Sequence, residues 1–337
     1  MVDLLGLDIG STTLKAAQIR GKALIAFSYS PAPKGASLIA ENKESWIEFS
    51  QAVAQLVVGG KFRGRNAVAA LPESQIFTRV VTLPKMSETE IDAAIKSEAQ
   101  QYVPLPLEQT TLDYEVLGTS EMDSEKTDVL LVAAPELLIQ RYLDVLRRAG
   151  LRPVSLEPET MALSRSVVGD TSGSSAMVVS LGAKTADISI FSGNALRFTR
   201  SIPTGGEALV RAVSQSFSLE TERAREYLKS YGLLEKEAGG KVLVAIKPVF
   251  DIIVEELRRA LTFYSSRRGK HIDRIVLVGG VANLPGILIY LAEALGVEVI
   301  RADPWEKLSI SESFPKEELA RLAPDFAVAV GLALKEV

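Results

Sequence analysis

The chain lacks cysteine altogether and has one histidine, His271, among its 337 residues. Without cysteine there is no disulfide framework and no thiolate zinc site. A single histidine also argues against a metal site built on imidazole ligands. What remains open is a hard-cation site built from carboxylate and phosphate oxygens.

Three other features are missing. No apolar run reaches the roughly 18 residues of a membrane span, so none is expected. There is no Gly-x4-Gly-Lys-Ser/Thr pattern, so any phosphate site must differ from a P-loop. There is no excess of basic residues either, since the net charge is −4, which argues against a nucleic-acid partner.

The length and the N-terminus set the broad class. A chain of 337 residues, 47% of them hydrophobic, is sufficient for about two domains with real cores. Asp3 and Asp8 interrupt the first apolar run and no basic segment precedes it, so it does not read as a signal peptide. We expect a soluble intracellular protein.

An internal repeat is the most informative pattern. From Leu4 the chain reads "LLGLDIGSTTLKAAQIRGKAL", an apolar strand that ends in Asp8 and a Gly-Ser-Thr-Thr bend. An offset of 172 residues brings this text onto "MVVSLGAKTADISIFSGNAL" without a gap, with Gly10 on Gly182, Thr13 on Thr185 and Gly21 on Gly193. Two similar half-domains, each opening with a β-hairpin, are the simplest explanation.

The two bends have a chemistry that suits phosphate. A tight bend presents backbone N–H groups to an anion, glycine allows close approach, and hydroxyl groups add donors. Two facing bends would clamp a polyphosphate, and Asp8 would orient water around a divalent ion. One such bend alone is most simply an ordinary hairpin turn. Two at one offset, together with "VLVGGVANLPG" after a buried strand, favour the phosphate site.

The helices are expected from capping and periodicity. Ser87 and Glu90 form a capping-box pattern before a helix that Pro104 stops. Helical text also covers residues 207–231. A long helix is expected from about Pro248 to Arg267, and a mostly apolar one closes the chain after Pro324.

The motifs resemble a known superfamily. "GLDIGSTTLK" resembles the first phosphate motif of the actin/DnaK/sugar-kinase superfamily, "SLGAKTADISI" its second phosphate motif and "IVLVGGVANLPGI" its adenosine motif. Within it the chain most resembles the type IV pilus assembly family PilM, relatives of the division protein FtsA. The stretches that carry this likeness are "TLPKMSETEIDAAIKSEAQQYVPLPLEQTTLDYEVL", "IPTGGEALVRAVSQSFSLETERAREYLKSYG", "EELRRALTFYSS" and "APDFAVAVGLAL".

The resemblance implies an α/β, actin-like (ribonuclease H-like) fold of two domains with an ATP cleft between them. It divides the chain into 1–74 (first part of subdomain 1A), 75–150 (inserted subdomain 1C), 151–174 (return to 1A and the connection between domains), 175–204 (first part of 2A), 205–270 (2B) and 271–337 (second part of 2A with the C-terminal helix).

The resemblance also assigns ATP or ADP with Mg²⁺ to this cleft, and Asp8 to the water shell of the metal. The expected nucleotide-binding residues are Gly10, Ser11, Thr12, Thr13 and Lys15 in the first bend, Gly182, Ala183, Lys184 and Thr185 in the second, Gly205 and Gly206 near a phosphate, Glu226 and Lys229 beside the adenosine, and Gly279, Gly280, Val281 and Asn283 in the adenosine motif. For Glu226 and Lys229 the alternative is an exposed helix pair. No catalytic residue is assigned.

One position departs from the superfamily. Ser180 stands where an acid usually lies, and it brings no negative charge. Metal and nucleotide could still bind, but fast hydrolysis is not expected, because a carboxylate that could orient the attacking water is gone. Asp187, seven residues along the hairpin, is not a clean substitute.

Three functions stay open at this point. The resemblance implies an ATP-binding scaffold of pilus assembly, cytoplasmic and peripheral to the inner membrane. It would bind the cytoplasmic N-terminal peptide of PilN in a groove between 1C and the first domain, and so join the inner-membrane alignment complex. The alternatives are a small-molecule kinase of the same superfamily and an FtsA- or MreB-like filament protein. The chain ends at "GLALKEV", so the amphipathic membrane helix of FtsA is not expected.

Overall fold

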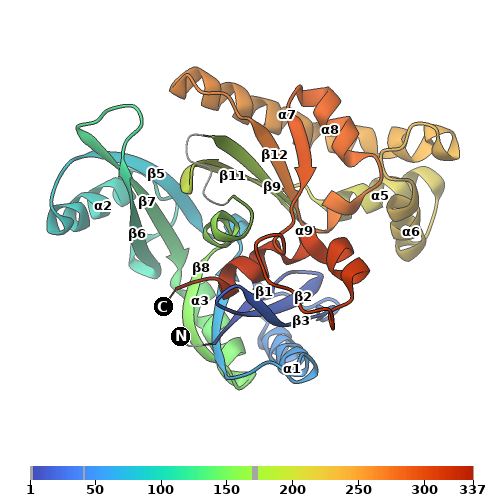
Figure 1. Cartoon of the computed structure of the whole chain (residues 1–337), viewed down its shortest axis with the longest axis horizontal. Coiled ribbons are helices and arrows are strands. Elements are labelled where there is room, and N and C mark those ends of the chain that lie inside the picture. The colour runs from blue at the N-terminus through green and yellow to red at the C-terminus, as the bar shows by residue number, and fades with distance from the viewer. Residues whose placement is uncertain (1–2, 41, 169–173, 337) are drawn as a thin grey trace.

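A computed structural model describes residues 3–40, 42–168 and 174–336, with two five-stranded sheets and one three-stranded sheet (Figure 1). The first sheet has the order β3-β2-β1-β4-β8 and the second the order β11-β10-β9-β12-β13. The strands of the first sheet are β1 (Leu4–Ile9), β2 (Thr13–Arg20), β3 (Ala23–Pro31), β4 (Asn66–Leu71) and β8 (Arg152–Pro158). Those of the second are β9 (Ser175–Leu181), β10 (Ala186–Ser192), β11 (Ala195–Ile202), β12 (Arg274–Val278) and β13 (Glu298–Arg301).

The sheets confirm the internal repeat. Each opens with three antiparallel strands and continues with two parallel ones. Even the irregularity recurs: the register shifts between Gln18 and Ile19 in the first sheet, and 172 residues later between Ile190 and Phe191 in the second. A bulge at the same place in both sheets bends both hairpins alike.

Helices α1 (Lys43–Gly59) and α3 (Glu136–Arg148) cover the outer face of the first sheet. Their buried side chains, among them Phe49, Val53, Tyr142 and Leu146, form one core with the strands. Helix α3 therefore packs in the core of the first domain, although the sequence boundary of 75–150 assigned it to the inserted subdomain.

The inserted sheet stands beside the first sheet, at the left of Figure 1, and has the order β5-β7-β6. Its elements are β5 (Phe77–Pro84), α2 (Glu88–Tyr102), β6 (Thr110–Thr119) and β7 (Lys126–Pro135). The sheet and α2 share a small core of their own. The capping box is confirmed, because the backbone N–H of Ser87 donates to the Glu90 carboxylate at 2.8 Å.

A buried ion cluster ties the inserted sheet to the second domain. Arg197 of β11 lies 2.6 Å from the Asp128 carboxylate of β7, which is fully buried, and 3.7 Å from Glu121. Lys270 also contacts Glu121, at 3.0 Å. The inserted subdomain therefore contacts both halves of the molecule.

The second sheet carries its helices on the outer face, and they form the largest core of the protein. They are α5 (Gly206–Phe217), α6 (Thr221–Tyr231), α7 (Lys241–Arg268) and α8 (Ile287–Leu295). The expected helix over 207–231 is two helices, because Ser218 turns into the left-handed region at φ 52°.

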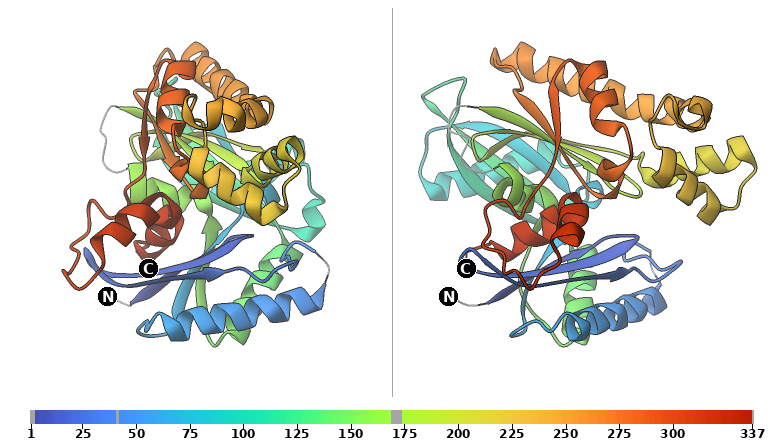
Figure 2. Two further views of the ribbon diagram at one scale, coloured as in Figure 1. Left: turned by 90° about the vertical axis from the view of Figure 1, so that its right-hand side faces the viewer. Right: turned by 45° about the vertical axis from the view of Figure 1, so that its right-hand side comes forward.

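Helix α9 (Lys316–Ala333) lies between the two sheets, with α4 (Glu159–Leu163) beside it (Figure 2). The contact is close: a Cβ on Gly6 of β1 would lie 2.1 Å from the carbonyl oxygen of Ala329. The closing helix therefore packs on both domains and joins them.

Two helices begin earlier than the sequence predicts. Pro248 and Pro324 were expected to open α7 and α9, but each lies about two turns inside its helix. A proline there costs roughly 3 kcal/mol. In α9 the turns that flank Pro324 bury Leu319 and Phe326, and this burial offsets the cost. None of the helices in the described residues is long and apolar enough to cross a membrane.

Candidate functional site

The first hairpin holds an ion pair at its bend. Asp8 is the last residue but one of β1, and Lys15 lies directly opposite on β2, with its Nζ 2.9 Å from the Asp8 carboxylate. Both side chains are largely buried. Burial opposes the charge on Lys15, but the carboxylates of Asp8 and Asp325 outweigh it and raise the pKa of Lys15.

The second hairpin reverses this arrangement. Ser180 takes the place of Asp8, and Asp187, which takes the place of Lys15, lies directly opposite it. The Thr185 hydroxyl donates to one Asp187 oxygen at 2.9 Å, while the other oxygen is buried without a hydrogen-bond partner among the described residues. Burial raises the pKa of Asp187 against the hydrogen bonds from Ser201 and Thr185. The acid missing at position 180 thus has a counterpart across the strand pair.

Both bends leave little room for a side chain at their glycine. A Cβ on Gly10 would lie 2.8 Å from the carbonyl oxygen of Thr13, and one on Gly182 would lie 3.2 Å from that of Thr185. The side chains that follow, Ser11 and Thr12 in one bend and Lys184 in the other, are exposed. The bends therefore present backbone and polar side chains to the space beside them.

Helix α5 begins against the second bend. The backbone N–H of Gly206 donates to the carbonyl of Gly182 at 2.9 Å, and that of Glu207 to Ala183 at 2.8 Å. A Cβ on Gly205 would lie 2.7 Å from both carbonyl oxygens. Gly205 and Gly206 therefore let the N-terminus of the helix, with its partial positive charge, back the second bend.

The expected adenosine motif packs on the same bend. Gly279 has φ +86°, and a Cβ there would lie 2.6 Å from the carbonyl of Leu181. Its N–H donates to the carbonyl of Pro324 at 2.8 Å. The Asn283 amide donates to the Asp325 carboxylate at 3.1 Å, and Gly280 lies beside the same carboxylate. The motif thus connects the second bend to α9.

Glu226 and Lys229 are both exposed on α6. The Glu226 carboxylate pairs with Arg223 on the same helix at 3.5 Å. The charge of Lys229 reaches Asp325, where it opposes the rise in pKa caused by burial. Lys229 therefore lies within electrostatic range of the Asp325 carboxylate that the adenosine motif contacts.

Three acids of the site were not identified from the sequence. Burial raises the pKa of Glu159, the first residue of α4, and the charges of Asp8 and Asp187 add to the rise. Glu73 accepts hydrogen bonds from the backbone N–H and the hydroxyl of Thr160, at 3.2 and 2.6 Å, and burial raises its pKa to about 7. Asp325 is the third. Asp325 lies within the stretch "APDFAVAVGLAL", which carried the family resemblance. Glu159 could have been noticed as an acid that directly follows strand β8.

These acids outnumber the cations that reach them. The charges of Asp8, Asp187 and Glu73 all raise the pKa of Glu159, and Lys15 is the cation that pairs with Asp8. Yet among the described residues no three acidic or histidine side chains converge closely enough to hold a metal by themselves. A divalent cation here would need further oxygen ligands, which phosphate groups supply. The residues therefore fit a metal–nucleotide complex better than a metal alone.

Comparisons with known proteins agree with this geometry. The family described as type IV pilus assembly protein PilM matches residues 6–337. A chain of the solved PilM–PilN type IV pilus biogenesis complex is 30% identical, with a TM-score of 0.87 over 99% of this chain and 98% of that one. MreB5 of Spiroplasma citri, solved with AMPPNP, is 14% identical and shares the fold, with a TM-score of 0.52 over 98% and 94% of the two chains.

Among curated relatives, the cell division protein FtsA of Neisseria meningitidis serogroup B (strain ATCC BAA-335 / MC58) is 24% identical over 290 residues. The match covers 74% of this chain and 66% of FtsA, so the chain spans just under two thirds of that relative. The α/β, actin-like fold of two domains with an insertion is confirmed. On a match that covers nearly its whole length, the chain belongs to the type IV pilus assembly protein PilM family.

Proposed function

We propose that this protein is a nucleotide-binding scaffold of type IV pilus assembly that holds the N-terminal peptide of a PilN partner. The observation that carries the proposal is the likeness, over the whole chain, to the PilM subunit of a PilM–PilN complex. The paired hairpins supply the nucleotide site and a groove beside the inserted sheet supplies the peptide site.

The nucleotide would be ATP or ADP with Mg²⁺. The bends at Gly10–Thr13 and Gly182–Thr185 would hold the phosphates from two sides, and Asp8 would hold water on the metal. The adenosine motif and Lys229 would lie against the base and sugar. When bound, the metal would neutralise both phosphate charge and the surrounding carboxylates.

A scaffold fits the site better than a kinase. Ser180 removes the acid that usually helps to orient a water molecule, and Asp187 is buried with a raised pKa. The nucleotide would then keep the two domains in a fixed relation, with α9 packed between them, rather than serve as a rapidly used substrate.

The groove for the peptide lies between the inserted sheet and the first domain. It encloses about 1160 Å³. Strands β6 and β7 supply one wall, and β8 and α3 supply the other. Its lining is mixed: apolar side chains such as Leu130, Ile139 and Leu156 lie beside charged ones such as Glu115 and Lys335. A few buried apolar anchors are what a short peptide needs.

The groove also has backbone edges on both sides. Strand β8 is the outer strand of the first sheet, and β6 is the outer strand of the inserted sheet. A peptide in extended conformation can pair with such an edge. This favours an extended peptide over a helical one in this groove.

The test is a titration with the N-terminal peptide of a PilN protein from the same organism. Val154→Glu on β8 and Thr111→Glu on β6 place a charge on the two walls, at exposed positions. Val116→Glu and Thr119→Glu are matched controls, exposed on β6 but outside the groove. Each wall variant should weaken binding about 10-fold or more, since a buried unpaired charge is costly, and the controls should not. Equal affinity in all five proteins would refute the peptide site.

The proposal places the protein on the cytoplasmic side of the inner membrane, attached to the alignment complex through its partner. A filament protein of the FtsA or MreB kind is the alternative. Sedimentation with Mg²⁺–ATP distinguishes them, because the scaffold should stay in the supernatant at concentrations at which a filament would pellet.

A further inference from the structure

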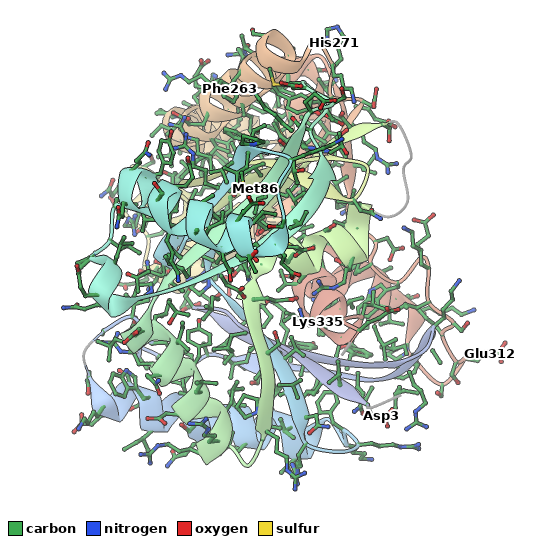
Figure 3. The ribbon with its side chains drawn as sticks, turned by 90° about the vertical axis from the view of Figure 1, so that its left-hand side faces the viewer. Asp3, Met86, Phe263, His271, Glu312 and Lys335 are labelled. Atoms are coloured by element: carbon green, nitrogen blue, oxygen red, sulfur yellow. The ribbon has the colours of Figure 1, made fainter. Side chains whose placement is uncertain are left out.

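Six basic side chains gather at one end of the first domain, although the chain as a whole is acidic. They are Lys61, Arg63, Arg65, Arg147, Arg148 and Arg152, and all six are exposed. We call this set the basic edge. Asp3, labelled in Figure 3, marks the same end of the molecule.

The topology explains why these residues meet. Strands β1, β4 and β8 are parallel, so all three start at one edge of the sheet. Helices α1 and α3 run back along the sheet between them, so both helices end at that edge. Direct contacts agree: the N–H of Arg152 donates to the carbonyl of Arg65 at 2.7 Å, and the charge of Arg63 reaches Asp3.

Within the part of the chain that the structure describes, no close ion pair neutralises the basic edge. Among the described residues none of the six side chains forms an ion pair within 4.0 Å, while Asp3 is taken by Arg20. Arg147 and Arg148 can be explained as cations at the C-terminal end of α3. This explanation does not apply to Arg65 and Arg152, because they lie at the start of strands and not at the C-terminal end of a helix, where unpaired carbonyl groups attract cations.

We propose that the basic edge binds the anionic surface of a membrane. The six charged side chains come from the ends of several elements at one edge of a sheet. None of the six lines the groove described above. No aromatic side chain is exposed among them on which a base could stack, and Phe62, which lies between Lys61 and Arg63, packs partly buried against the core of the first domain. Anionic lipid headgroups attract such a cluster with about 1 kcal/mol for each Lys or Arg near the surface.

The position of the groove supports the same partner. Pro153 and Val154 line it and follow Arg152 directly, and Lys22 lines it two residues after Arg20. One end of the groove therefore lies at the basic edge. A peptide that entered there from a membrane protein would bring the basic edge toward the lipid. The inference goes beyond the proposed function, since it concerns a surface outside the groove and the cleft.

The experiment is co-sedimentation of the whole chain, without peptide, with phosphatidylcholine vesicles that contain or lack phosphatidylglycerol. Arg63→Glu, Arg65→Glu and Arg152→Glu are combined in one variant. Lys85→Glu, Lys96→Glu and Lys316→Glu form the control, with the same change in charge at exposed residues elsewhere. Peptide binding and thermal unfolding of both variants show whether the groove and the fold are intact.

The wild-type chain should bind the anionic vesicles, should not bind the neutral ones, and should be released by salt. Reversal of the three edge charges should weaken binding at least about 100-fold, since the loss of three positive charges alone removes about 1 kcal/mol each, and the control should retain most of the binding. No binding of the wild-type chain, equal binding to neutral vesicles, or an equal loss in the control would overturn the inference. If the wild-type chain does not bind the vesicles, an acidic protein becomes the alternative partner of the basic edge. None of these outcomes would affect the peptide titration.

Discussion

Ser180 lies directly opposite Asp187 in the second hairpin, at the positions that Asp8 and Lys15 occupy in the first. The two hairpins thus have the same strand pairing but carry different charged side chains at the paired positions. The first bend has an acid on its inner strand paired with a lysine. The second has a neutral inner residue and an acid on the neighbouring strand. This exchange underlies the first two predictions.

Ser180→Asp should destabilise the nucleotide-free protein, because it places a second carboxylate opposite the buried Asp187. We expect its melting temperature to fall by a few degrees, and the increase caused by Mg²⁺–ATP to exceed that of the wild type. Differential scanning fluorimetry measures both. The double variant with Asp187→Asn carries one acid again and should recover the nucleotide-free melting temperature. An unchanged melting temperature in Ser180→Asp would show that the two positions do not interact.

Asp8→Ala should weaken nucleotide binding more with Mg²⁺ than without it. The change removes the acid expected to orient the metal's water, and it also removes the partner of Lys15, which is then free to attract phosphate. Isothermal titration of ATP with Mg²⁺ and with EDTA separates the two effects. An equal loss in both conditions would mean that Asp8 acts through the shape of the bend and not through the metal.

Glu73 should make stability depend on pH. Burial raises its pKa from 4.5 to about 7 in the folded state. Between these values the folded protein keeps the proton that the unfolded chain has lost, so the free energy of unfolding falls as pH rises, by up to about 3 kcal/mol. Glu73→Gln keeps an acceptor for Thr160 without the titration.

Urea unfolding of nucleotide-free protein between pH 4.5 and 8 gives this dependence. The wild type and Glu73→Gln should be about equally stable near pH 4.5, and the variant should be the more stable of the two at pH 8. Other buried acids add slopes of the same sign to both proteins, so the difference between the two curves isolates Glu73. Parallel curves would contradict the prediction.

Arg197→Met should destabilise the fold by about 3 kcal/mol, since it breaks the buried cluster with Asp128 and Glu121 that joins the inserted sheet to the second domain. Arg200→Met is a matched control on the same strand, because Arg200 is half exposed and its ion pair with Glu256 is expected to contribute no more than about 1 kcal/mol. Urea unfolding compares the two. Similar losses would show that the cluster adds nothing beyond a surface ion pair.

The hairpins and the bends at Gly10 and Gly182 could be predicted because their signals are local, whereas the binding of phosphate there stays a prediction. Gly10 and Gly182 lie in bends formed by the residues next to them, and the apolar runs of β1, β9 and β10 are buried along nearly their whole length. The boundaries of α7 and α9 could not be predicted, because the burial that outweighs Pro248 and Pro324 comes from distant elements.

The acid cluster is the other part that the sequence did not reveal. Glu73 follows β4, Glu159 opens α4 and Asp325 lies in α9, so nothing in their spacing places them together. Their raised pKa values come from burial between two domains, which exists only in the folded chain. The assignment of α3 to the inserted subdomain has a similar origin, since its partner α1 lies far away in sequence.

The central claim is that the paired bends bind a nucleotide that is held rather than rapidly consumed. Isothermal titration of nucleotide-free protein with Mg²⁺–ATP, followed by a turnover assay on the same sample, tests it most directly. We expect saturable heat, close to one site per chain, and turnover far below the roughly 1–100 s⁻¹ of kinases. No heat of binding, or turnover within that range, would contradict it.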